Sequence, residues 1–196
     1  SYLMSGKQDE DELVAIINKS KCLQPVDIPA WVTKLCDADR SSLPSTLITF
    51  AQDTNNFNAL KLFYNKLKDL PKKDRDNLMN WLSRYCTALC DDGRFIAYKG
   101  VCDDYFDRYS RTIFNGVGSV VSIPRDSVDP NENIACTKGL HVGSRQYADD
   151  YRAGGKLLSV AVDPADVVVV PNDSSYQKIR VCQYEVLREI TCTSGD

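Results

Sequence analysis

The sequence predicts an α+β fold, in which an N-terminal helical bundle packs on a mixed, mostly antiparallel β-sheet half. Two observations lead to this prediction. Apolar residues recur at helical spacing up to residue 92, and from residue 93 they occur in short, β-branched runs separated by turns. The change of period divides the chain into a helical region, 1–92, and a β-rich region, 93–196. Since almost no linker separates the two regions, we expect them to share one core.

The helical region is predicted to contain helices of ordinary length, each with one apolar face. Their segments are 9–20, 27–39, 44–52, 55–70 and 71–93. The last segment carries the clearest pattern, because its apolar stripe runs from Leu78 through Trp81 to Leu89. Pro71 suits the first turn of that helix, and Gly93 is expected to end it.

The β-rich region is predicted to hold strands and one main helix. The strand segments are 94–101, 112–125, 139–144, 156–162, 166–171 and 178–190. An Asn-Gly pair at 115–116 signals a turn ahead of the second of these strands. Ser144 is placed to cap a helix formed by "RQYADDY".

Composition excludes several classes of function. The net charge is −3 and no basic stripe occurs, so nucleic acid is not an expected partner. No apolar run reaches the ~20 residues of a transmembrane span, and the first residues show no signal-peptide pattern. Eight scattered cysteines and one histidine predict neither a disulfide framework nor a metal site. Cys86 and Cys90 would share a helical face, but two thiolates do not complete a zinc site.

Four segments then suggest a family. "DDGRFIAYKGVCDDYFD", "CTKGLHVGSRQYADDY", "VDPADVVVVPND" and "QKIRVCQYEVL" occur in order between residues 91 and 191. This stretch resembles the C-terminal region of the rIIB family of T-even and related tailed bacteriophages. The resemblance implies a phage protein in the cytoplasm of an infected bacterium, peripheral to the inner membrane. It implies an accessory role in phage–host conflict, including counter-defence and escape from exclusion, through a host or phage protein such as an rIIA-like partner. It supplies no catalytic residues, so we expect binding rather than catalysis.

A remoter similarity concerns chemistry. "GLHVGSRQYADDY" and Gln183–Tyr184–Glu185 resemble two motifs of ADP-ribosyltransferase-like folds. In that superfamily a first-strand Arg or His anchors NAD, and the final Glu supports an oxocarbenium-like transition state. Lys99 stands at the anchor position here. The resemblance gives an alternative function, an NAD-dependent enzyme or a nucleotide-binding protein, with Glu185, Gln183 and His141 as catalytic candidates.

The same layout predicts a cleft for a polar ligand with an aromatic ring, such as a small nucleotide. Its expected lining is Tyr98, Lys99, His141, Ser144 and Glu185. An amine is a point charge and lacks the planar two-point grip of an arginine, so we expect ligand binding without NAD turnover. The alternative interpretation is structural: His141 would be an ordinary strand residue, and Gln183 and Glu185 would form a wet face at a sheet rim.

The acidic and aromatic segment "CDDYFDRYSR", 102–111, is the candidate partner surface. Aromatic and arginine side chains are enriched where proteins contact each other, and the segment offers Tyr105, Phe106, Arg108 and Tyr109. Its acids do not have the spacing of an EF-hand loop, so a calcium site is not predicted. The alternative is a packed structural loop.

Overall fold

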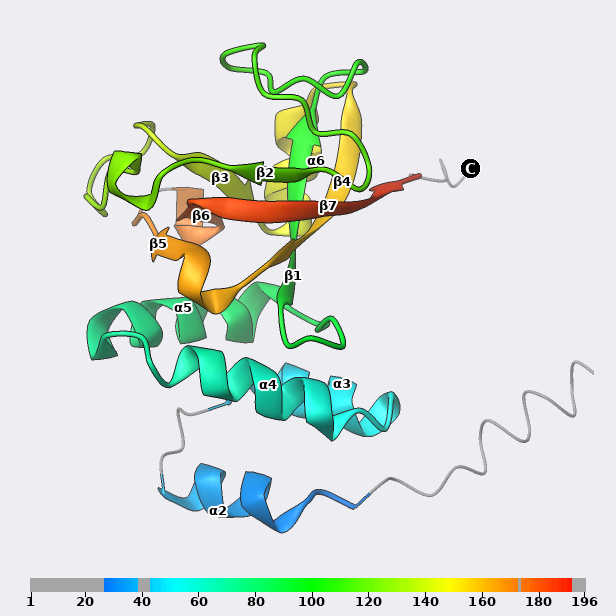
Figure 1. The fold of residues 1–196 in the computed structure, drawn as a ribbon, viewed down its shortest axis with the longest axis vertical. Coiled ribbons are helices and arrows are strands. Elements are labelled where there is room, and N and C mark those ends of the chain that lie inside the picture. Colours follow the sequence, from blue (N-terminus) through cyan, green and yellow to red (C-terminus); the bar gives the residue numbers. More distant parts are fainter. Residues whose placement is uncertain (1–26, 39–42, 173, 192–196) are drawn as a thin grey trace, which may run out of the picture.

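The computed structural model describes residues 27–38, 43–172 and 174–191. Helices form one layer of the molecule, and a strongly curved sheet forms the other (Figure 1). The α+β prediction is confirmed. The helix expected at 9–20 lies outside the described residues.

Four helices form the first layer: α2 (Ala30–Ala38), α3 (Ser45–Asp53), α4 (Phe57–Leu67) and α5 (Lys72–Tyr85). They confirm helices in the remaining expected segments. The side chain of Asn56 caps α4 by accepting a hydrogen bond from the Ala59 N–H at 3.1 Å. Leu60, Phe63 and Leu67 of α4 are buried as the stripe requires.

The predicted end of the last helix is wrong. Helix α5 stops at Tyr85, the backbone is extended at Cys86, and Leu89 forms an antiparallel bridge with Phe95. Gly93 has a φ of +82° and belongs to a tight turn, in which the Cys90 N–H donates to the Arg94 carbonyl at 2.8 Å. Asp-Gly is a strong turn former, so the local turn chemistry overrides the helical spacing of the residues before it. Cys86 and Cys90 consequently share no helical face.

Seven strands form one sheet with the order β2-β7-β4-β1-β3-β6-β5, and each pairing is antiparallel. Their bounds are β1 (Phe95–Val101), β2 (Val120–Ser122), β3 (Leu140–Gly143), β4 (Lys156–Val162), β5 (Val167–Val169), β6 (Lys178–Val181) and β7 (Gln183–Ile190). Three 3-10 turns lie between strands: η1 (Arg125–Ser127), η2 (Pro164–Asp166) and η3 (Ser174–Tyr176). The edge strands β2 and β5 have three residues each.

The expected last strand is two strands, with Cys182 alone between them. Strand β6 pairs with β3, whereas β7 pairs with β4, and β1 lies between β3 and β4. The sheet therefore curves strongly, because one nearly continuous segment reaches both of its halves. The halves meet at β1 and β3, whose register contains the single pair Tyr98 and Gly143. Beyond that pair the two strands separate.

Helix α6 (Arg145–Arg152) covers β1 on the side away from the core helices. Ser144 caps it by accepting a hydrogen bond from the Tyr147 N–H at 3.1 Å, as the sequence predicts. Gly100 of β1 allows the helix to approach, because a Cβ there would lie 2.3 Å from the Ala148 carbonyl oxygen. The strand and helix thus dock backbone to backbone.

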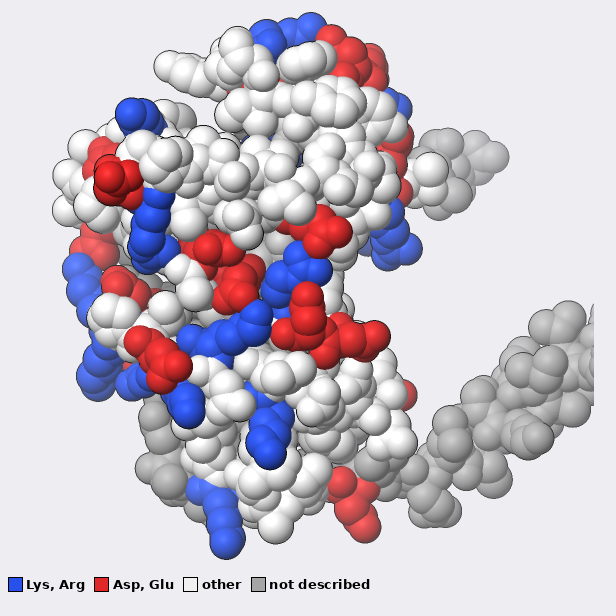
Figure 2. Space-filling view, viewed as in Figure 1, with Lys and Arg blue, Asp and Glu red and all other residues white. Residues whose placement is uncertain are grey.

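One hydrophobic cluster contains buried residues from the helices and from the sheet. Trp81 of α5 joins the two layers: its ring lies 5.8 Å from that of Phe95, and its Nε1 donates to the Gln177 carbonyl at 3.1 Å. At the rim of this junction, Arg94 forms ion pairs with Asp92 and Glu185. Figure 2 shows acidic and basic side chains next to each other on the surface where the helices meet the sheet. No described helix is long and apolar enough to cross a bilayer.

Candidate functional site

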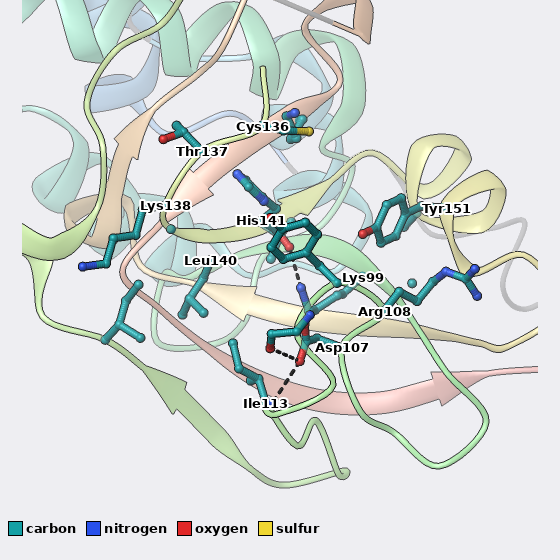
Figure 3. Close-up of a pocket in the computed structure, with 18 of the residues that line it drawn as sticks. Lys99, Asp107, Arg108, Ile113, Cys136, Thr137, Lys138, Leu140, His141 and Tyr151 are labelled. Carbon is teal, nitrogen blue, oxygen red and sulfur yellow. Dashed lines mark hydrogen bonds between the residues drawn. The ribbon is translucent and has the colours of Figure 1, made fainter. Parts of the chain in front are cut away.

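A cavity of about 710 Å³ lies where β1 and β3 separate. Its walls come from these strands, from α6, and from the loops 102–119 and 123–139. The volume falls within the ~300–1,000 Å³ that is typical of small-molecule sites. In Figure 3 the Lys99 side chain reaches into the cavity, with Lys138 on one side and Arg108 and Tyr151 on the other.

The structure brings together part of the expected ligand-binding set. Tyr98, Lys99 and His141 line the cavity. Ser144 lies outside the lining and donates through Oγ to the Gln177 side-chain oxygen at 2.6 Å. Glu185 also lies outside it, where its carboxylate accepts from Arg94 at 2.6 Å. Tyr98, Lys99 and His141 are therefore the sequence-predicted residues that a ligand in this cavity would meet.

Gln183, the third catalytic candidate, is exposed and pairs with Ser122 on the edge strand. It shares the outer face of β7 with Glu185, as alternation along a strand predicts. Neither side chain lines the cavity that contains His141.

Lys99 is a half-buried charged residue between two core positions. Its neighbours on the same face of β1, Ala97 and Val101, are fully buried. Its Nζ donates to the His141 carbonyl at 2.8 Å and lies 5.5 Å from the centre of the Tyr184 ring. Desolvation lowers the pKa of Lys99 to about 8, and the nearby Asp107 charge offsets only part of this effect.

Asp107 shapes the loop 102–119 rather than binding Lys99 directly. Its carboxylate accepts from the N–H groups of Ser110, Thr112 and Ile113, and from the Ser110 hydroxyl. Desolvation opposes ionisation, but these hydrogen bonds outweigh it, and the pKa of Asp107 lies below its ordinary value. The carboxylate is thus ionised and already occupied by its own loop.

Two buried cations hold the opposite wall, and sequence reasoning missed both. Arg180 is 0% exposed and donates to the carbonyls of Asp129, Asn131 and Ile134. Lys178 donates to the Ala135 carbonyl. In "KIRV" these residues alternate with Ile and Val, a pattern that normally marks a solvent-facing side. The acceptors are backbone carbonyls, so the sequence carries no signal of the contact.

The cavity is rich in cations and tyrosines. Its described lining includes the cations Lys99, Arg108, Lys138 and Lys178 and the phenols Tyr98, Tyr109, Tyr147 and Tyr151. Asp107 is the only carboxylate among these described lining residues. The local charge is thus positive in a chain whose net charge is −3. Such a lining suits an anion that carries an aromatic ring.

Metal ligation is not indicated by the arrangement of side chains. Within the described ranges, no three His, Cys, Asp or Glu residues are grouped as metal ligands. Cys86 is buried, and desolvation raises the pKa of its thiol to about 12, which disfavours a metal-binding thiolate.

The candidate partner surface divides into packed and exposed residues. The Tyr105 hydroxyl donates to Glu189 at 2.7 Å, and the Lys156 amine lies 5.0 Å from the centre of its ring. Phe106 packs on Phe114. Tyr109, by contrast, is 92% exposed.

We expect Tyr105→Ala to lower the free energy of unfolding by about 1–3 kcal/mol, because it removes both packing and a hydrogen bond. Tyr109→Ala should change it by less than about 0.5 kcal/mol. Urea denaturation of the two variants checks this difference. If Tyr109→Ala lowered the free energy of unfolding as much as Tyr105→Ala is expected to, the whole segment would be a structural loop.

These features define an α+β protein whose antiparallel sheet opens around a ligand-sized, cationic cavity. The family model described as bacteriophage T4 protein rIIB matches residues 41–195. Protein rIIB of Enterobacteria phage T4 is 34% identical over 154 residues, which cover 78% of this chain and 49% of that protein. The chain belongs to the bacteriophage T4 rIIB family, and it spans about half the length of this relative. No solved structure matches the chain.

Proposed function

We propose that this rIIB-like phage protein acts by binding, and that its cavity takes a small anion with an aromatic ring, such as a nucleotide. The observation that carries the proposal is the position of Lys99 at the opening between β1 and β3. Its amine lies in a cavity with several tyrosines and further cations. The only carboxylate of the described lining, Asp107, is engaged by its own loop.

The positions of two residues support binding over NAD-dependent transfer. Glu185, the carboxylate that the transferase hypothesis needs, is paired with Arg94 outside the cavity lining. Lys99, which the transferase resemblance sets at the anchor position, lacks the planar fork of an arginine. Nicotinamide release from NAD should accordingly stay at background. Release that disappears in Glu185→Ala would promote the enzyme hypothesis instead.

The biological role that we propose is an accessory one in phage–host conflict, with counter-defence as its purpose. Family membership supports it, as does the exposed aromatic side chain of Tyr109 at the cavity rim. The proposed partner is a host or phage protein, of which an rIIA-like protein is the first to test. The proposed location is the host cytoplasm, next to the inner membrane.

Ligand binding is tested by titration calorimetry with AMP, UMP and NAD. We expect saturable binding of at least one of them to the full chain. Lys99→Met should weaken it about tenfold or more, because a charge-assisted contact is worth about 1.5–3 kcal/mol. The matched control is Lys61→Met, which removes an exposed lysine on α4. Absence of binding, or equal effects of the two substitutions, would contradict the proposal.

Affinity should depend on pH through Lys99. An anion stabilises the ammonium form, so the bound ligand raises the pKa of this amine above its free value of about 8. The ligand's affinity is then greatest below that value and falls as the pH rises through it. Calorimetry at pH 7 and pH 9 measures the change. An affinity that stays constant in wild type between these pH values would exclude Lys99 as the anion contact.

A further inference from the structure

We propose that Lys99 is a carbonyl-reactive amine, which forms an imine with the aldehyde of a small anionic molecule held in the cavity. This is a covalent activity beyond reversible ligand binding. It stands on the position of the amine in the fold, and it does not require that a nucleotide is the natural ligand.

The first support is the environment of the amine. Lys99 lies on the central strand β1 among buried apolar neighbours, and its Nζ contacts a backbone carbonyl and an aromatic face. Among the residues that the structure describes, no carboxylate forms an ion pair with it. Lys99 is half-buried, and the loss of hydration without an ion-pair partner favours the neutral form of its amine.

The second support is that the neutral amine still satisfies its surroundings. A neutral amine keeps two N–H bonds, so it can donate to the His141 carbonyl while its lone pair remains for reaction. The titratable and charged groups around it include Asp107 and Arg108 from the loop 102–119, Lys138 from the loop 123–139, His141 from β3, Lys178 from β6, Tyr184 from β7, and Tyr147 and Tyr151 from α6. The pKa of Tyr184 is raised by burial, so its phenol stays neutral at the pH at which Lys99 titrates.

Protonation then decides the reactivity. With a pKa of about 8, roughly a quarter of the Lys99 amines are neutral at pH 7.5. An ordinary lysine has about one neutral amine in a thousand at that pH. Lowering the pKa of a lysine by desolvation is a general way to activate it as a nucleophile.

The third support is room for the reacting molecule beside the amine, because the amine lies in the cavity.

The reaction itself is balanced. The lone pair attacks the aldehyde carbon, forming the C–N bond, and the carbonyl oxygen becomes a hydroxyl. The two hydrogens of the amine leave with this oxygen as water, and the C=N bond forms. No oxidant or reductant is needed. The cavity of about 710 Å³ has room for both the aldehyde and the water that leaves.

The lining indicates the class of aldehyde. Arg108 and Lys138 add positive charge near the amine, and Tyr147 and Tyr151 form a stacked pair in the same wall. An aldehyde with a phosphate or carboxylate group and a planar ring matches these contacts. Pyridoxal 5′-phosphate has all three features and serves as the probe.

The experiment treats the full chain with limiting pyridoxal 5′-phosphate, reduces the imines with borohydride and locates them by peptide mass spectrometry. At pH 7.5 we expect Lys99 to be modified about tenfold faster than the exposed Lys61 and Lys68 in the same sample. The rate at Lys99 should level off above pH 8, whereas the rates at Lys61 and Lys68 should continue to rise toward pH 10. Lys99→Met should abolish the fast modification, and Lys61→Met should leave it unchanged.

The comparison among lysines is made within the wild-type chain, so it does not depend on the folding of a variant. Modification of Lys99 no faster than that of Lys61, or preferential modification of Lys138 at the rim, would overturn the proposal. A pH profile at Lys99 that rises to pH 10 like those of the exposed lysines would overturn it as well. These outcomes are separate from nucleotide titration, because a reversible site and a reactive amine are measured by different signals.

Discussion

Replacing Arg180 with methionine should lower the free energy of unfolding by about 3–5 kcal/mol. The guanidinium is fully buried and donates to the backbone carbonyls of Asp129, Asn131 and Ile134. The substitution removes the buried guanidinium with its hydrogen bonds, and the part-buried carbonyls lose their donors. Gly139 leaves room for the Arg180 side chain, since a Cβ at Gly139 would lie 2.8 Å from it.

Urea denaturation measures the loss, with Arg188→Met as the control. Arg188 is an exposed arginine on β7, and its substitution should cost less than about 0.5 kcal/mol. Because Arg180 holds the loop whose continuation, Cys136–Lys138, lines the cavity, ligand binding should also weaken in Arg180→Met. A loss below about 1 kcal/mol would show that the loop is held by other contacts.

Trp81→Ala should cost about 3–5 kcal/mol, the usual range for removing a buried large aromatic side chain. Trp81 is 1% exposed, packs on Tyr85 and Phe95, and donates to the Gln177 carbonyl. These contacts join α5 to the sheet, so wild type should unfold in one transition, and the variant should show the same single transition at lower denaturant. Tyr109→Ala is the control for loss of an exposed aromatic side chain.

The measurement follows tryptophan fluorescence and far-ultraviolet circular dichroism together. Coincident curves indicate that helices and sheet unfold as a unit. Two separated transitions in wild type would show instead that the helical region and the sheet are independent, and the cost of Trp81→Ala would then fall on the helical region alone.

Local chemistry explains which elements the sequence predicts correctly. "GLHVGS" followed by "RQYADDY" gives β3, a serine cap and α6, because strand alternation and capping are both local. The hairpin at Gly93 is missed for a related reason. The apolar residues before the turn keep helical spacing, which predicts a longer helix. The Asp-Gly turn and the pairing of Leu89 with Phe95 make the backbone extended there instead.

The sequence predicts the candidate site correctly only for residues on β1 and on β3, the strand that pairs with it. Tyr98 and Lys99 are adjacent on β1, and His141 follows from the pairing of β3 with that strand. Glu185 is placed by the sheet order, which sets it beside Arg94 and outside the cavity lining. That order depends on the bend at Cys182, and a single residue between two strands of alternating polar and apolar residues gives no sequence signal of a bend.

The sheet order also has a consequence for self-association. Its two edge strands, β2 and β5, are three residues long, and the β5 ladder contains a register shift between Val167 and Val169. A short or irregular edge offers few aligned N–H and C=O groups to the strand of another molecule. Pairing β1 with β4 closes a long loop, and non-local pairing of this kind generally slows folding. The short edges therefore limit the strand-to-strand aggregation to which a seven-stranded sheet is otherwise open.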